Sequence, residues 1–279
     1  STSNFKSIDK MLILSPDVRQ GTIDIIPTGS GKMLNTSFYK GFKAACFTVA
    51  AVASFQASAD IVISGTRIVY QQSQKDVIVS LDNRGKKPLL VQSWLDDGRD
   101  DTNPQELKLP FIITPPVSRI DPQKGQSVRI SYLGGSLPQD RESLFWFNVL
   151  EIPPKSKVKD GENPNQLQLA FRTRIKLFFR PDGLKGTPGN AAARVTWSQQ
   201  KQGNTLNLIA HNDSPYNVSI SNVKLKSANK EYQVEHKSIL PFSTQIMQVK
   251  GLGSTATGTV AYETINDNGG SDTFESKVN

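Results

Sequence analysis

"QLQLAFRTRIKLFFRP", residues 166–181, is a stretch in which almost every second side chain is apolar. Because alternate side chains of a β-strand point to opposite faces, its odd positions form one row: Leu167, Leu169, Phe171, Thr173, Ile175, Leu177 and Phe179. The strand continues for about fourteen residues before Pro181 ends it, whereas strands in globular domains usually have about 3–10 residues. The row is therefore longer than the core of its own domain requires.

The chain around this stretch predicts an all-β domain over residues 60–181. Short runs rich in β-branched and aromatic residues are separated by turn residues, at 61–70, 76–83, 89–95, 111–115, 127–133 and 144–152. With the stretch above they make seven short strands, a number and spacing typical of an immunoglobulin-like sandwich.

A second sandwich is expected from residue 191 to residue 279. Residues 182–190, DGLKGTPGN, are rich in Gly and Pro and suit neither a strand interior nor a helix, so they are interpreted as an interdomain linker. A further series of strand-like runs follows, including ARVTWSQ, TLNLIAHN and TVAYETI. The sequence thus predicts two β-sandwich domains.

Residues 33–59 have the order of a secretory signal peptide. Lys40 and Lys43 precede an apolar run that is too short to span a bilayer, and Ala57 and Ala59 form a small-residue cleavage site. The mature chain is expected to begin at Asp60, without a membrane span. Residues 1–32 are interpreted as upstream sequence that is not native to the protein.

Composition and motifs argue against several classes of function. The formal charge is +8, but the basic residues are scattered and form no RNA-binding signature, so nucleic acid is not an expected partner. The single cysteine, Cys46, lies in the signal segment, and His211 and His236 have no metal-ligand spacing. No nucleophile or metalloprotease motif occurs in the mature chain. We expect no enzyme activity, catalytic residue, metal or cofactor.

The stretch LPQDRESLFWFNVLEIPP, residues 137–154, resembles the signature of the PapD-like periplasmic chaperones of pilus assembly. Four further matches occur in the expected order: GTRIVY, IKLFFRP, HNDSPYNVSISNV and TINDNGG. The resemblance implies two immunoglobulin-like domains in an L shape, located in the periplasm. It also implies that the protein lends its seventh strand to pilus or fimbrial subunits by donor-strand complementation and delivers them to an outer-membrane usher. The surplus apolar row would then complete a subunit's core.

The resemblance also assigns residues to this function. Arg67 and Lys176 match the pair that binds the subunit's C-terminal carboxylate, and Leu167, Leu169 and Phe171 match the groove-filling row. One difficulty follows from parity, since Lys176 is even-numbered and the apolar row is odd, so simple alternation places them on opposite faces. Strand twist, a bulge, or a cleft reached from the side would each reconcile the two.

Three charged residues match family positions that connect the two domains: Glu142, Arg180 and Asp267. An arginine between two carboxylates would fix the interdomain angle. As a surface pair it would contribute only about 0–1 kcal/mol, so its value would be orientational.

The alternative is a secreted two-domain structural protein or adhesin. The mature start runs directly into the first strand without a donor extension, and the mature chain has no cysteine, which both weigh against it. Self-association of the free protein through its exposed strand is left open by the sequence.

Overall fold

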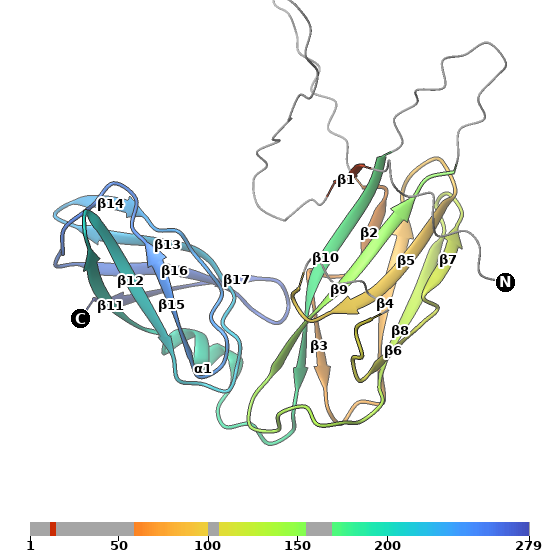
Figure 1. Ribbon diagram of the computed structural model, residues 1–279, viewed down its shortest axis with the longest axis horizontal. Coiled ribbons are helices and arrows are strands. Elements are labelled where there is room, and N and C mark those ends of the chain that lie inside the picture. Colours follow the sequence, from red (N-terminus) through yellow and green to blue (C-terminus); the bar gives the residue numbers. More distant parts are fainter. Residues whose placement is uncertain (1–11, 15–58, 100–105, 155–168, 279) are drawn as a thin grey trace, which may run out of the picture.

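The computed structural model describes residues 12–14, 59–99, 106–154 and 169–278, which form two β-sandwich domains joined by a short connection (Figure 1). Leu167 and all of the expected signal peptide except Ala59 lie outside these residues. In the described part of the chain, no helix is long and apolar enough to cross a membrane. The predicted all-β architecture is confirmed.

The first domain consists of two sheets with one apolar core between them. One sheet contains β3 (Arg67–Gln71), β10 (Leu169–Arg180), β9 (Ser143–Ile152), β5 (Leu89–Asp96) and β7 (Val117–Ile120). The other contains β2 (Ile61–Ile63), β4 (Asp76–Asn83), β8 (Gly125–Tyr132) and β6 (Phe111–Thr114). Alternation selects the core side chains: in β4, Val79 and Leu81 are buried, whereas Ile78 and Ser80 are exposed.

The run at 61–70, which the sequence predicts as one strand, is divided between the two sheets. β2 pairs with β4, and β3 pairs with β10. Gly65 lies between them with φ +97°, a conformation that glycine adopts without steric cost. This break moves the chain from one sheet to the other, so that β3 begins at Arg67 beside β10.

β10 is a strand of 12 residues whose two halves have different surroundings. Ile175 and Leu177 in its second half are buried in the domain core, whereas Leu169 and Phe171 are only half-buried. The register with β9 is continuous from Phe171 to Phe179, so no bulge interrupts the alternation. On the opposite edge, β3 pairs only with the five residues from Lys176 to Arg180, and the first half of β10 therefore extends beyond β3.

A short strand in the upstream segment, β1 (Leu12–Leu14), was not predicted. It runs parallel to β10, with its three residues opposite Leu169, Ala170 and Phe171. This edge of β10 can therefore accept an added strand in the parallel direction.

The second domain also has two sheets around one core. The first contains β11 (Thr196–Gln202), β12 (Thr205–Asn212) and β15 (Ser243–Gln248). The second contains β14 (Lys230–Gln233), β13 (Ile220–Ser227), β16 (Thr259–Ile265) and β17 (Ser271–Lys277). In β16 the alternate residues Val260, Tyr262 and Thr264 are buried.

The connection between the domains leads into a helix, α1 (Pro188–Ala193). The expectation that residues 182–190 would exclude helix is therefore wrong for the last three of them. The side chain of Thr187 caps the helix by accepting a hydrogen bond from the Asn190 amide at 3.2 Å. Pro188 suits the first helical turn because its fixed φ is already helical.

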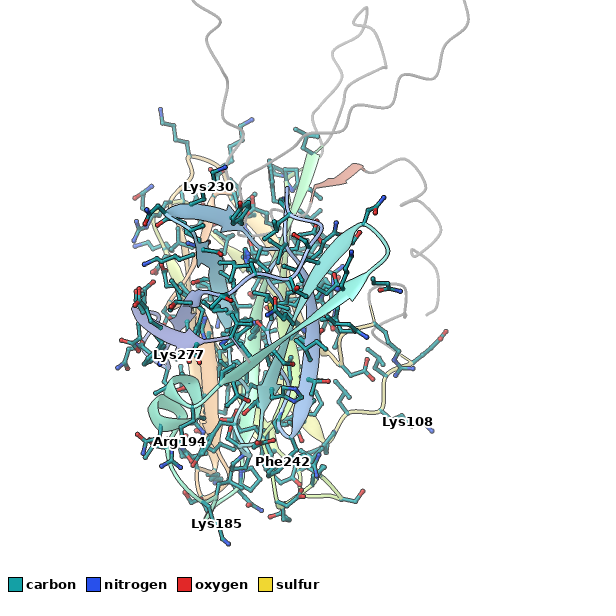
Figure 2. The ribbon with its side chains drawn as sticks, turned by 90° about the vertical axis from the view of Figure 1, so that its left-hand side faces the viewer. Lys108, Lys185, Arg194, Lys230, Phe242 and Lys277 are labelled. Atoms are coloured by element: carbon teal, nitrogen blue, oxygen red, sulfur yellow. The ribbon has the colours of Figure 1, made fainter. Side chains whose placement is uncertain are left out.

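Several basic residues of the second domain and of the connection before it lie apart from one another on the surface. Figure 2 shows Lys185, Arg194, Lys230 and Lys277 well separated on the face of the molecule that it presents. These four residues therefore form no common cationic patch on that face.

Tyr262 gives a prediction about alkaline stability. Its hydroxyl donates to the Ala192 carbonyl at 2.8 Å, the residue is 1% exposed, and burial raises the pKa of the phenol from 10 to about 12. Since the unfolded chain loses this proton first, the stability that the group contributes is complete below pH 10 and is lost as the pH rises toward 12. We expect the free energy of unfolding to fall by about 1–3 kcal/mol more than in Tyr262→Phe over this interval. Urea unfolding at several pH values measures the difference, and equal declines in both proteins would contradict the prediction.

Candidate functional site

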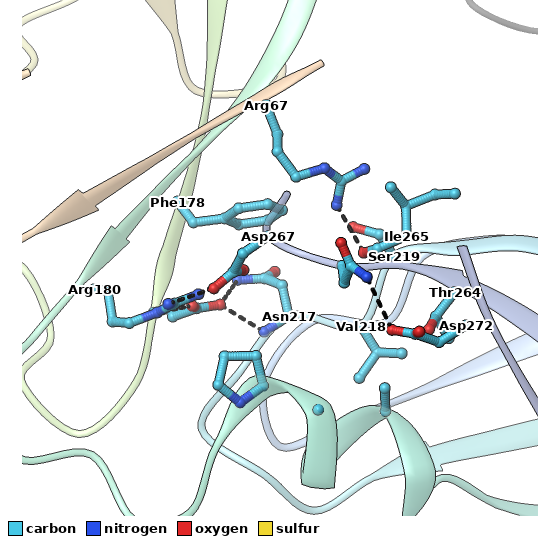
Figure 3. A pocket seen from close by; sticks show the side chains of 15 residues that line it. Arg67, Phe178, Arg180, Asn217, Val218, Ser219, Thr264, Ile265, Asp267 and Asp272 are labelled. Atoms are coloured by element: carbon cyan, nitrogen blue, oxygen red, sulfur yellow. Dashed lines mark hydrogen bonds and ion pairs between the residues drawn. The ribbon is translucent and has the colours of Figure 1, made fainter. Parts of the chain in front are cut away.

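Arg67 and Lys176 lie opposite each other on adjacent parallel strands, as register partners of β3 and β10. Both side chains point toward the second domain. Arg67 Nη1 donates to the Ile265 carbonyl at 2.9 Å (Figure 3), and Lys176 Nζ donates to Ser238 Oγ at 2.8 Å. Two cations that are 109 residues apart in sequence are thus brought to one position between the domains.

The surroundings of Arg67 favour an anion. Burial lowers the pKa of its guanidinium, and the negative charge of Asp267 acts in the opposite direction. The group remains protonated at neutral pH, because an arginine does not lose its proton in proteins. Arg67 Nε is buried and has no hydrogen-bond partner among the described residues. A buried donor without a partner costs about 1–3 kcal/mol, which an incoming acceptor would relieve.

Aromatic rings lie beside both cations. The guanidinium carbon of Arg67 is 6.0 Å from the centre of the Phe178 ring, and Lys176 Nζ is 5.7 Å from that of Trp146. A small pocket of about 40 Å³ beside Arg67 is lined by both domains (Figure 3). Pockets for small molecules usually measure about 300–1,000 Å³, so this one is too small to enclose a ligand of that kind.

Arg180 connects the two domains a little further along β10. Its Nε donates to Glu142 Oε1 at 2.7 Å, and its two terminal nitrogens donate to the Asp267 carboxylate at 2.8 and 3.0 Å. Glu142 Oε2 accepts from the backbone and side-chain nitrogens of Asn217 in the second domain, at 2.8 and 3.0 Å. The three predicted charges therefore lie together at the domain boundary.

This ion-pair cluster is more buried than the surface pair considered from the sequence. The Arg180 and Glu142 side chains are 10% and 1% exposed, whereas that of Asp267 is 38% exposed. Burial acts to lower the pKa of Arg180, but the hydrogen bonds and charges of Asp267 and Glu142 outweigh it, and the pKa is raised. The estimate of about 0–1 kcal/mol for a surface pair does not apply to the Arg180–Glu142 pair.

The residues predicted to fill a subunit groove lie in the first half of β10. Leu169 and Phe171 are both half-buried, and Leu167 lies outside the described residues. Ile175 continues the same row into the domain core, whereas Lys176 faces the second domain. Lys176 and the apolar row therefore lie on opposite faces, as alternation predicts, and the continuous register rules out a bulge from Phe171 to Phe179.

The sequence reasoning missed a charge cluster on the Lys176 face of the first domain. Arg174 makes two hydrogen bonds to the Asp96 carboxylate, at 2.5 and 3.2 Å, and Asn148 Nδ2 donates to the same carboxylate at 2.6 Å. The guanidinium carbon of Arg174 also lies 4.4 Å from the centre of the Trp146 ring. The only sequence signal was the run of cations at even positions, Arg172, Arg174 and Lys176, opposite the apolar row.

Over 59–99, 106–154 and 169–278, no three His, Cys, Asp or Glu side chains are grouped so that they could hold a metal ion.

Both domains match known families. Residues 60–185 match the family described as "Pili and flagellar-assembly chaperone, PapD N-terminal domain". Residues 190–276 match "Pili assembly chaperone PapD, C-terminal domain".

Similar proteins support the same assignment. The chain is 49% identical over 229 residues to a protein of Escherichia coli K12 described as a probable fimbrial chaperone, YadV, covering 81% of this chain and 93% of the relative. It is 38% identical over 226 residues to the chaperone protein FimB/FhaD of Bordetella pertussis, covering 80% and 89%.

Solved structures agree with these sequence relatives. The crystal structure of the YadV chaperone superimposes with a TM-score of 0.69 at 47% identity, covering 78% of this chain and all of that chain. The SafB chaperone of Salmonella enterica, solved in complex with the SafA pilin, has a TM-score of 0.63 at 27% identity, covering 78% and 95%. With two family matches that together span most of its length, the chain belongs to the PapD family of pilus-assembly chaperones.

Proposed function

We propose that this chaperone acts in the periplasm, where it lends the first half of β10 to a pilus or fimbrial subunit and binds the subunit's C-terminal carboxylate between Arg67 and Lys176. The observation that carries the proposal is the position of this pair. Arg67 and Lys176 are register partners at the first residue of β3. The part of the β10 edge that precedes Lys176 is not covered by β3.

The strand directions fix how a subunit strand would add. β3 runs parallel to β10 and covers its edge only from Lys176 onward. A subunit strand on the preceding part of the edge, with its terminal carboxylate at Arg67, must therefore run in the same direction as β10. This is the direction in which β1 pairs with Leu169–Phe171. The anchored carboxylate then sets the register, which an apolar row alone specifies weakly against shifts of two residues.

Affinity would come chiefly from apolar side chains of the lent strand. A subunit that lacks an edge strand exposes unpaired backbone groups beside an apolar groove, and such an edge aggregates. Filling the groove with Leu167, Leu169 and Phe171 contributes roughly 1.5–3 kcal/mol for each side chain that becomes fully buried. Main-chain hydrogen bonds add about 0.5–1.5 kcal/mol each. This mode of recognition is β-augmentation.

The wider role follows from the family and the leader-like segment. Residues 33–59 would direct the chain to the periplasm, and the loaded chaperone would deliver its subunit to an outer-membrane usher. The protein would act without catalysis or a cofactor, as a binding protein. The alternative of a secreted structural protein or adhesin is not favoured, because both domains match the chaperone family.

Co-expression with the pilus subunits encoded beside it tests the proposal. Tagged chaperone, residues 60–279, should retain a β-rich subunit in a periplasmic pull-down. Phe171→Ala should weaken retention by about 10- to 100-fold, since it removes one groove-filling side chain. Ile246→Ala, which removes an apolar side chain that is 53% exposed in the second domain, is the matched control. No retention by the wild type, or equal retention by Phe171→Ala, would contradict the proposal.

A further inference from the structure

Lys176 is held by hydroxyl groups of the other domain. Its Nζ lies 2.8 Å from Ser238 Oγ and 3.5 Å from Ser219 Oγ. The first distance is that of a good hydrogen bond, and the second is at the limit of one. These contacts connect the Lys176 ammonium to the second domain, and Ser238 makes the shorter of the two.

The local structure of the second domain explains why both hydroxyls face Lys176. Val218 and Ile239 form an antiparallel bridge with two backbone hydrogen bonds of 2.9 Å, and they are 1% and 0% exposed. Because side chains alternate along extended backbone, Ser219 and Ser238 point away from the core that Val218 and Ile239 fill. The bridge sets the two serines opposite each other on the side that meets the first domain.

The serines suit a cation that must bind an anion. A hydroxyl accepts a hydrogen bond from the ammonium group and is itself neutral, so it orients Lys176 without cancelling its charge. The neighbouring Arg180 forms ion pairs with Glu142 and Asp267. The domain boundary thus contains Arg180, which carboxylates bind, and Lys176, which hydroxyl groups of the second domain contact.

We propose that Ser238 is a positioning residue for the carboxylate anchor. It holds the Lys176 ammonium beside the Arg67 guanidinium, so that both cations can bind the same subunit carboxylate. This inference rests on the proposed function, since it requires that Lys176 binds the carboxylate. It adds that the docking of the two domains controls the anchor, because the positioning hydroxyl comes from the second domain.

The test compares two synthetic peptides of alternating valine and threonine, one ending in a free carboxylate and the other in a carboxamide. Their affinities for the chaperone are measured by fluorescence anisotropy. Wild type should prefer the carboxylate peptide, and Ser238→Ala should reduce its affinity by about 2- to 10-fold while the carboxamide peptide is unaffected. Ser238→Thr keeps a hydroxyl and should retain the preference. Ser221→Ala, which removes a hydroxyl that contacts Glu263, is the matched control.

The ratio of the two affinities separates positioning from general stability, because a merely structural defect would weaken both peptides. If wild type prefers the carboxylate and Ser238→Ala keeps the whole preference, the role of Ser238 is overturned and the anchor stands. If wild type binds both peptides equally well or equally poorly, the carboxylate anchor itself fails, and this inference fails with it.

Discussion

Replacing Lys176 with methionine is expected to remove capture of the subunit at concentrations where the wild-type chaperone is saturated. Methionine keeps much of the length and apolar stem of lysine but has no charge. A subunit carboxylate in the proposed site would then lose one of two cations in a partly desolvated position. Truncating one partner of such a pair costs about 2–5 kcal/mol, which corresponds to a loss of about 30-fold to several thousand-fold in affinity.

Lys176→Met removes the interdomain hydrogen bond to Ser238 Oγ as well as a charge, just as replacing Arg67 would remove the one to the Ile265 carbonyl. Lys250→Met, at an exposed position of the second domain, is the matched control for loss of one positive charge. Affinity is measured by titrating purified chaperone variants against the captured subunit, and the fold is checked by thermal unfolding. Undiminished affinity of a folded Lys176→Met protein would contradict the carboxylate anchor.

The long strand β10 and the two sandwiches were predictable because they depend on local alternation. The row from Leu169 to Phe179 has period two in the sequence and keeps it in β10, where the register with β9 is continuous. The division of residues 61–70 was not predictable in the same way. Residues 64–67, SGTR, interrupt the apolar run, but the move to a second sheet depends on the positive φ of Gly65 and on pairing with β10, which is distant in sequence.

The site was only partly predictable, because its contacts cross between domains. Family positions suggested Arg67, Lys176 and the Arg180 cluster, but nothing local to Ser238 indicates that its hydroxyl meets a lysine 62 residues away in sequence. The Asp96–Arg174 pair was missed for the same reason, since its partners are 78 residues apart. Such pairs follow from the register of distant strands and from the docking of the domains, which composition and periodicity do not contain.

Replacing Arg180 with alanine is expected to loosen the connection between the domains and to lower subunit capture, while each domain stays folded. The change would leave the Glu142 carboxylate, whose side chain is 1% exposed, without its cation. Removing one partner of a buried ion pair typically costs about 3–5 kcal/mol. Because each domain has its own apolar core, we expect this free-energy cost to weaken the interdomain contact and the adjacent edge of the first domain, and not to unfold either domain.

The geometry explains why capture should fall as well. Lys176 and Arg180 lie on the same strand and face the second domain, so a change in the interdomain angle at Arg180 moves Ser238 and Ile265 relative to the anchor. Small-angle X-ray scattering should report a broader distribution of interdomain distances for Arg180→Ala. Arg119→Ala, whose side chain is 69% exposed and pairs with Asp121, is the matched control.

A double variant separates orientation from stability. Arg180→Met combined with Glu142→Gln removes both buried charges, and replacing a whole buried pair with neutral groups is often close to neutral for stability. We expect the double variant to recover most of the thermal stability that Arg180→Ala loses, but not the affinity for the subunit, since no ion pair then fixes the angle to the second domain. Full recovery of affinity in the double variant would mean that Arg180 and Glu142 only neutralise each other's buried charge and do not fix the interdomain angle. Unchanged capture by Arg180→Ala would show that the anchor does not depend on this connection.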